Sequence, residues 1–102
     1  MPRDDDSLTE DEIAQALLSL TGWAFAEDRR SIHRSFRFDS FTRAMAFMIA
    51  CAIEAEKIDH HPDWSNSYRI VDVKLTSHDA KGVTKRDIAL AALMDAYAEK
   101  EA

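Results

Sequence analysis

The segment Ala44–Ala55 limits the possible folds of this chain more than any other, because it is apolar almost all round. Asp39 or Ser40 can cap a helix over Phe41–Ile58, and within the central segment only Glu54 is charged. A helix of this kind has to be covered on more than one face. The sheet of a small domain covers one face, so we expect a second subunit to cover another. The alternative cover is another helix of the same chain.

The chain has the composition of one small globular domain. Its 102 residues are 46% hydrophobic and 31% charged, which is ordinary for a soluble protein. With 13 basic and 19 acidic residues its net charge is −6, which argues against direct binding to nucleic acid or to an anionic membrane. The single cysteine, Cys51, excludes an internal disulfide, and its apolar surroundings predict a buried side chain rather than a reactive thiol.

Residues 1–8 are predicted to form a flexible acidic tail, and residues 9–102 a single domain. The first residues are charged and contain no apolar signal region, and no uncharged apolar span is long enough to cross a membrane. We therefore expect a cytoplasmic protein without a membrane partner.

The amino-terminal part predicts a helix and two strands. Thr9 and Glu12 can form a capping box, and Thr21-Gly22 is expected to end the helix that follows. A first strand is predicted over Trp23–Phe25, and an alternating pattern after a charged turn predicts a second, with Arg34 interrupting its apolar face. The apolar stripe of the helix consists of Ile13, Ala16, Leu17 and Leu20. The apolar face of the second strand consists of Ile32, Phe36 and Phe38.

The carboxy-terminal part predicts two strands and a helix. A first strand places three residues on one face, namely Trp64, Tyr68 and Ile70. A second strand, Val71–Thr76, has the opposite register, so a tight turn or bulge is expected near Arg69–Val71. Thr84 caps a third helix, whose stripe is Leu90, Leu93, Met94 and Tyr97. The order α-β-β-α-β-β-α predicts an α+β fold, a four-stranded antiparallel sheet with three helices packed on one face.

The run Asp59–Asp63 holds two adjacent histidines, His60 and His61, directly before Pro62. Proline disfavours the helical conformation of the residue before it, so the chain is expected to turn here, which would let both imidazoles serve one site. A third histidine, His78, follows the last predicted strand. Imidazole titrates near neutral pH, so these residues predict an acid–base site in which one ring donates a proton and another accepts it.

Other interpretations of the histidines remain open. A zinc site would take a further ligand from Asp59 or Asp63, although adjacent histidine ligands are geometrically awkward. Alternatively, the histidines only cap the end of the second helix, where cations are favoured. In the acid–base site the same two aspartates would orient the rings. The enzymatic interpretation requires His60, His61 and His78 to converge on one cleft.

Structural roles are expected for several neighbouring residues. Glu56 can be part of the solvated helix surface, and Asp87 stands at the third helical position after Thr84, where a carboxylate caps backbone amides. Trp23 and Trp64 are either part of the core or an apolar wall for a flat ligand.

A longer pattern is shared with a known family. It consists of Glu56, Asp59-His60-His61-Pro62, Trp64, Tyr68, Thr76-Ser77-His78-Asp79, Thr84 and Asp87. In this pattern the chain closely resembles the pterin-4a-carbinolamine dehydratases. The resemblance extends from Phe36 to the last helix, whereas the earlier residues match mainly in helix placement and in Gly22-Trp23. The family often has Ser-Thr-His-Glu over 76–79, so hydroxyl and carboxylate are both retained here.

The resemblance implies a lyase, 4a-hydroxytetrahydrobiopterin dehydratase. The enzyme eliminates water from 4a-hydroxytetrahydrobiopterin, or a related 4a-hydroxytetrahydropterin, to give quinonoid dihydropterin. It thereby recycles the cofactor of aromatic amino-acid hydroxylases, and it needs no metal or organic cofactor. The resemblance also implies a homodimer or homotetramer, with sheets joined edge to edge and second helices in a central bundle.

The resemblance also assigns roles to residues. His60 and His78 would be the catalytic acid–base pair, and His61 would hold the substrate. The full set expected to bind the pterin is Asp59, His60, His61, Thr76, Ser77, His78 and Asp79. Supporting roles fall to Glu56, Pro62, Trp64 and Asp87.

An interaction-only protein of the same fold is the alternative. Relatives of the family also act as dimerisation cofactors of a homeodomain transcription factor or as assembly factors, a role that would use the apolar second helix. The retention of all three histidines favours the enzyme. The sequence leaves open which pterin is the substrate and whether the protein is a dimer or a tetramer.

Overall fold

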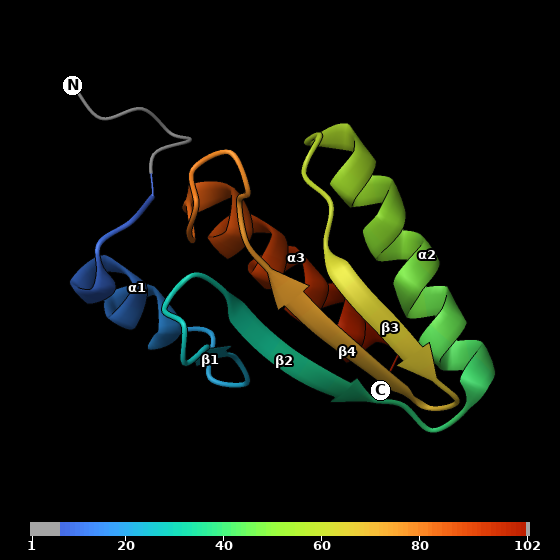
Figure 1. The fold of residues 1–102 in the computed structure, drawn as a ribbon. Coiled ribbons are helices and arrows are strands. Elements are labelled where there is room, and N and C mark those ends of the chain that lie inside the picture. The colour runs from blue at the N-terminus through green and yellow to red at the C-terminus, as the bar shows by residue number, and fades with distance from the viewer. Residues whose placement is uncertain (1–6, 102) are drawn as a thin grey trace.

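The helices and strands follow one another in the predicted order (Figure 1). The computed structural model describes residues 7–101. The helices are α1 (Glu10–Leu17), α2 (Phe41–Lys57) and α3 (Lys85–Lys100), and the strands are β1 (Ala24–Phe25), β2 (Ile32–Arg37), β3 (Asp63–Ser67) and β4 (Ile70–Leu75). All strand pairs are antiparallel, and the order across the sheet is β1-β2-β4-β3. The predicted α+β fold is confirmed.

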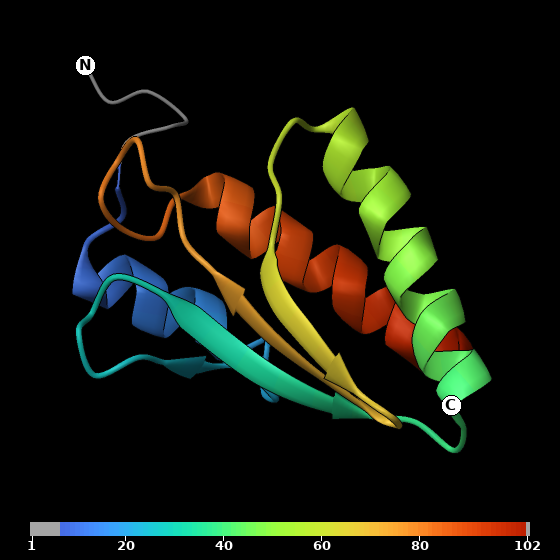
Figure 2. The same ribbon diagram turned by 45° about the vertical axis from the view of Figure 1, so that its right-hand side comes forward.

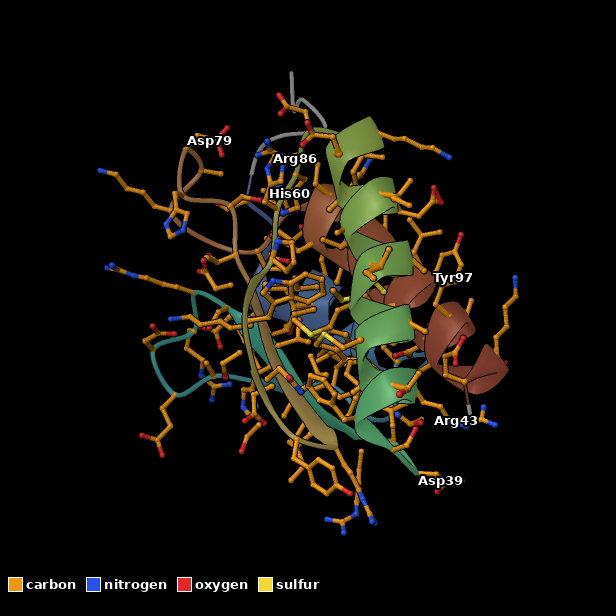
Figure 3. The ribbon with its side chains drawn as sticks, turned by 90° about the vertical axis from the view of Figure 1, so that its right-hand side faces the viewer. Asp39, Arg43, His60, Asp79, Arg86 and Tyr97 are labelled. Atoms are coloured by element: carbon orange, nitrogen blue, oxygen red, sulfur yellow. The ribbon has the colours of Figure 1, made fainter. Side chains whose placement is uncertain are left out.

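The helices lie on one face of the sheet, as the view of Figure 3 shows. Aromatic rings fill the layer between the sheet and α2: Phe47 lies 4.8 Å from Phe36 and 4.9 Å from Phe38 between ring centroids. Along β2, Ile32 and Phe36 are buried whereas His33 is exposed. The opposite face of the sheet is therefore polar, which matches the alternating pattern of the sequence.

The predicted tail over residues 1–8 lies mostly outside the described residues. Of its last two residues, Leu8 contacts the domain. The backbone N–H of Leu8 donates to the carbonyl of Val83 at 2.7 Å, and its side chain packs against the core. Leu8 thus contacts the domain although it lies before the predicted boundary.

Helix α1 begins as predicted but ends earlier. Thr9 Oγ1 accepts a hydrogen bond from the N–H of Glu12 at 3.1 Å, and the carboxylate of Glu12 accepts one from the N–H of Thr9 at 2.8 Å. The helix ends at Leu17, so the prediction that it continues to Thr21-Gly22 is wrong. The next residues bond carbonyls three positions back, and this tighter winding carries Leu20 into the core.

The hairpin between β3 and β4 turns at Tyr68-Arg69, because Ser67 pairs with Ile70. The turn lies one residue earlier than predicted, and the expectation that Tyr68 belongs to the apolar face is wrong. Tyr68 has φ 54 and is 61% exposed. The side-chain amide of Asn66 donates to the carbonyls of Tyr68 and Ile70 at 3.1 and 3.0 Å, which holds this turn.

Helix α2 is covered on one side and open on another. α3 packs beside it (Figure 2), so a helix of the same chain supplies part of the cover. Ile49 and Ile53 nevertheless remain 62% and 54% exposed. Burial raises the pKa of the Cys51 thiol to about 12, which confirms a structural rather than a reactive cysteine. Within residues 7–101 no helix has the length and apolar character needed to cross a membrane.

The arginine that interrupts the apolar face of β2 has a partner on α3. Arg34 donates from Nη1 to Asp95 Oδ1 at 2.7 Å, and its guanidinium lies 4.3 Å from the ring centroid of Phe36. The indole N–H of Trp23 donates to the same carboxylate oxygen at 2.8 Å. A Cβ atom at Gly22 would lie 2.6 Å from the guanidinium, so a larger residue here would have to displace the end of the Arg34 side chain.

The substitution Gly22→Ala is expected to destabilise the fold by about 1–2 kcal/mol, because the added methyl group pushes the guanidinium away from Asp95. Urea unfolding of the two proteins measures this difference. In the background of Arg34→Ala the same methyl group has room, and its cost should fall below about 0.5 kcal/mol. An equal cost in both backgrounds would show that the guanidinium is not the reason for the glycine.

Candidate functional site

The predicted site residues gather at one end of the sheet. α2 ends there, β3 begins there, and the loop from β4 enters α3 there (Figures 1 and 2). His60, Arg86 and Asp79 lie at this end, whereas Asp39 and Arg43 lie at the opposite end (Figure 3). The tertiary fold thus brings together segments that are far apart in the sequence.

The end of α2 makes the adjacent histidines point in different directions. Asp59 adopts a left-handed conformation, with φ 52. Its N–H bonds the carbonyl of Glu56 at 3.2 Å, and the N–H of His60 bonds the carbonyl of Ala55 at 3.0 Å. These two bonds form a Schellman motif, in which aspartate tolerates the left-handed position better than most residues. The sharp turn is therefore made at Asp59, before the proline, and it sends His60 inward and His61 outward.

The buried carboxylate of Asp87 joins three segments of the chain. Oδ1 lies 2.5 Å from His60 Nε2, and Oδ2 accepts hydrogen bonds from the Ser77 hydroxyl and from the N–H of Thr84, both at 2.9 Å. The side chain of Asp87 is fully buried, and that of His60 is 8% exposed. The predicted cap of α3 is confirmed. The sequence did not indicate that the same carboxylate also holds His60.

His61 reaches solvent and is held by Glu56, whose Oε1 lies 2.8 Å from His61 Nε2. Both side chains are exposed. Of the two aspartates expected to orient the rings, Asp63 lies beside His78. His61 is held instead by a helix residue, and His60 by the buried carboxylate. The reason is the turn, which separates the two rings and brings each beside a different element.

His78 is the most exposed of the three predicted catalytic residues, with 83% of its side chain accessible. Its Nε2 lies 3.6 Å from Asp63 Oδ2. Asp63 opens β3 and directly follows the half-buried Pro62. This contact brings His78 beside the segment that carries the other two histidines.

Most side chains of the segment before α3 form hydrogen bonds that hold the segment in place. Thr76 Oγ1 donates to the carbonyl of Arg30 at 2.6 Å, and Ser77 is buried against the carboxylate described above. Arg86 donates to both carboxylate oxygens of Asp79, at 2.9 and 3.1 Å. These hydrogen bonds hold the pKa of the Asp79 carboxyl below its usual range. The backbone and the imidazole of this segment are therefore better placed for a ligand than its other side chains.

The three histidines lie at one end of the sheet, but the expectation that they converge on one cleft is not met within this single chain, because His60 is buried and the cavity beside His78 includes neither of the other two. His78 lines a cavity of about 220 Å³ together with Thr76, and the walls of this cavity include neither His60 nor His61. Both tryptophans pack against the core, Trp23 completely and Trp64 in part. Among residues 7–101 no three histidine, cysteine or acidic side chains are grouped closely enough to hold a metal ion.

The two adjacent histidines are expected to differ sharply in their effect on stability. His60→Ala removes a partner from a buried carboxylate and should lower the free energy of unfolding by about 3 kcal/mol. His61→Ala breaks an exposed pair and should change it by less than about 0.5 kcal/mol. Urea unfolding measures both. Equal losses in the two variants would contradict the buried position of His60.

The chain is similar to known proteins over nearly its whole length. Residues 6–97 match the sequence profile of the family described as Pterin 4 alpha carbinolamine dehydratase. A protein of Mesorhizobium japonicum named "Putative pterin-4-alpha-carbinolamine dehydratase" is 54% identical over 92 residues, which cover 90% of this chain and 94% of that protein. A protein of the same name from Sinorhizobium medicae is 54% identical over 87 residues, covering 85% and 83%.

Solved structures agree with these relatives. The crystal structure of a "transcriptional coactivator/pterin dehydratase" from Brucella melitensis superposes with a TM-score of 0.89 at 47% identity, and the match covers 91% of this chain and 99% of that one. A pterin dehydratase-like protein identified as a RuBisCO assembly factor shares the fold, with a TM-score of 0.66 at 24% identity over 76% and 89% of the chains. By its sequence and its fold, the chain belongs to the pterin-4a-carbinolamine dehydratase family.

Proposed function

We propose that this protein is a dehydratase that removes water from a 4a-hydroxytetrahydropterin, giving quinonoid dihydropterin. The observation that carries the proposal is the set of three histidines at one end of the sheet, each beside its own carboxylate. The pairs are His60 with Asp87, His61 with Glu56 and His78 with Asp63. In the cytoplasm the reaction would help to regenerate the pterin cofactor of aromatic amino-acid hydroxylases.

The reaction needs one proton donor and one proton acceptor. The lone pair of N5 forms the C4a=N5 bond as the C4a–O bond breaks, and an acid protonates the departing hydroxyl to give water. A base then takes the proton from N5. The proton count balances between the two groups, so histidines can carry out the whole reaction near neutral pH without a redox partner.

We assign the two proton transfers to His60 and His78, and substrate binding to His61. Asp87 fixes one ring nitrogen of His60 at 2.5 Å, which orients the imidazole. His78 is exposed and so is accessible to a substrate. The contact between Glu56 and His61 orients a ring that can bind the pterin from the side of α2. The exposed backbone around Asp59 and His78 supplies further polar groups for the edge of the pterin ring.

Stopped-flow absorbance with a synthetic 4a-hydroxytetrahydropterin tests this assignment. His78→Ala should lower kcat by roughly 10²–10⁴-fold, the range expected for an acid–base group, without unfolding the protein. His60→Ala should lower kcat to a similar extent, with a stability loss that is measured separately. His61→Ala should mainly raise KM.

The matched control is His33→Ala, which removes an exposed histidine on the polar face of β2. This variant should keep the kcat and KM of the wild type. If the wild type is no faster than buffer, or if His78→Ala and His33→Ala behave alike, the proposed dehydratase mechanism is wrong.

We also propose that the protein is a homodimer or homotetramer assembled through α2. The exposed side chains of Ile49 and Ile53 flank an apolar hollow of about 480 Å³, which Glu56 and Lys57 border. Apolar surface of this kind on a small domain is typical of an interface. The same apolar surface would also serve an interaction-only protein. This second candidate function is suggested by the Brucella melitensis structure, which is named a transcriptional coactivator as well as a pterin dehydratase.

Light scattering after size-exclusion chromatography tests the assembly. Ile53→Glu places a charge on the apolar surface and should shift the protein to monomers, whereas Tyr68→Glu, which changes an equally exposed side chain in the hairpin turn, should not. A wild type that is monomeric at micromolar concentration would contradict a homo-oligomer. A heterologous partner of α2 would then be the next hypothesis.

A further inference from the structure

The cavity beside His78 has a basic wall in an acidic protein. Its lining brings together the turn before β2, the end of β4 and the loop before α3, and consists of Asp28, Arg30, Ser31, Lys74, Thr76, His78 and Lys81. Arg30, Lys74 and Lys81 give it three cations against one carboxylate, although the whole chain carries a net charge of −6. This local excess of positive charge is contrary to the overall composition.

The described residues form no ion pair with the three cations, although Asp63 stands opposite Lys74 on the neighbouring strand. Within residues 7–101, no carboxylate lies within ion-pair distance of the side chains of Arg30, Lys74 or Lys81. The one carboxylate in the wall, Asp28, accepts a hydrogen bond from the backbone N–H of Arg30 at 2.9 Å, so it stabilises the turn. Like charges gathered without counter-charges repel one another, and an anion in the cavity would relieve this repulsion.

The wall is held rigidly and contains an unused polar group. Thr76 Oγ1 donates to the carbonyl of Arg30 at 2.6 Å and so ties the end of β4 to the turn before β2. Ser31 is buried, and among the described residues its hydroxyl has no hydrogen-bond partner. Buried hydroxyls are almost always bonded. Ser31 also lines the cavity, so an acceptor there would supply the missing bond if the side chain turned its hydroxyl to the cavity surface.

We propose that this cavity binds a phosphate ester carried by the C6 substituent of the pterin substrate, an inference that rests on the proposed function. A phosphate monoester carries nearly two negative charges at pH 7 and accepts hydrogen bonds on three oxygens. The three cations and the serine hydroxyl match both properties. A neutral dihydroxypropyl substituent would leave the cations without counter-charges.

The position of the cavity fits the chemistry of the ring. The proton is lost from N5, and C6 is bonded directly to N5. If His78 serves the reacting atoms, the C6 substituent therefore begins two bonds from N5, near the residue that also lines the cavity. Lys74 and Lys81 line the same cavity as His78, so they are the cations that an anionic end of this substituent would meet.

The test compares two 4a-hydroxytetrahydropterins that differ only in a phosphate on the C6 side chain. The wild type should have a KM about tenfold lower for the phosphorylated substrate, as expected for roughly 1.4 kcal/mol from several charge contacts. The double variant Lys74→Gln/Lys81→Gln should lose this preference while it keeps kcat for the unphosphorylated substrate. Lys100→Gln, at the end of α3, removes one positive charge away from the cavity and should keep the preference.

A second readout does not depend on turnover. Titration of inorganic phosphate into the full chain, followed by NMR, should shift the signals of Ser31 and of the His78 imidazole in the wild type, and not in the double variant. Equal KM values for the two substrates, together with no phosphate-dependent shifts, would overturn the inference and leave the dehydratase proposal standing. If the protein dehydrates neither substrate, both proposals about pterins are overturned. Phosphate-dependent NMR shifts would in that case indicate an anion site for another ligand.

Discussion

The hydrogen bonds of the Asp87 carboxylate hold together the end of the molecule at which the predicted site residues meet. One oxygen lies beside His60 from the turn after α2, and the other accepts from Ser77 after β4 and from the cap of α3 at Thr84. A buried carboxylate is tolerated only when it is bonded in this way. The three segments therefore have to arrive together, and a movement of any one would cost the buried carboxylate one of its hydrogen bonds.

The hydrogen bonds of Asp87 fix one histidine in the interior and leave the other two accessible. His60 is fixed in the interior, whereas His61 and His78 contact carboxylates at the surface. A rigid ring next to two accessible rings suits a reaction in which a flat substrate has to be oriented while protons are exchanged. Because of this geometry, effects on stability and on activity can be measured separately. Removal of the buried ring is expected to lower the stability of the fold, and removal of an exposed ring is not.

The candidate site also borders two further features of the surface. On one side Glu56 orients His61 and also lines the apolar hollow of α2, so an assembly through α2 would lie next to the site. On the other side His78 lines the basic cavity. If both proposals hold, assembly and recognition of a charged substituent would depend on different residues around one set of histidines.

The sequence predicted the elements well where local physics decides them. The capping boxes of Thr9 and Thr84, the alternation of β2 and the apolar helix after Ser40 all depend on neighbours within a few residues, and all are observed. The order of elements and the α+β class follow from these. The errors lie at ends of elements, such as the early end of α1 and the turn at Tyr68, where side-chain hydrogen bonds and burial outweigh propensity.

The chain by itself thus determined which residues could form a site, since three histidines and several acidic residues stand at predicted element ends. Only the tertiary structure decided their partners. Asp87 reaches His60 across 27 positions, and the cations at Arg30, Lys74 and Lys81 come from three separate segments. No periodicity or spacing encodes such pairs, because they depend on how the strands pair and where the helices pack, and these are properties of the whole fold.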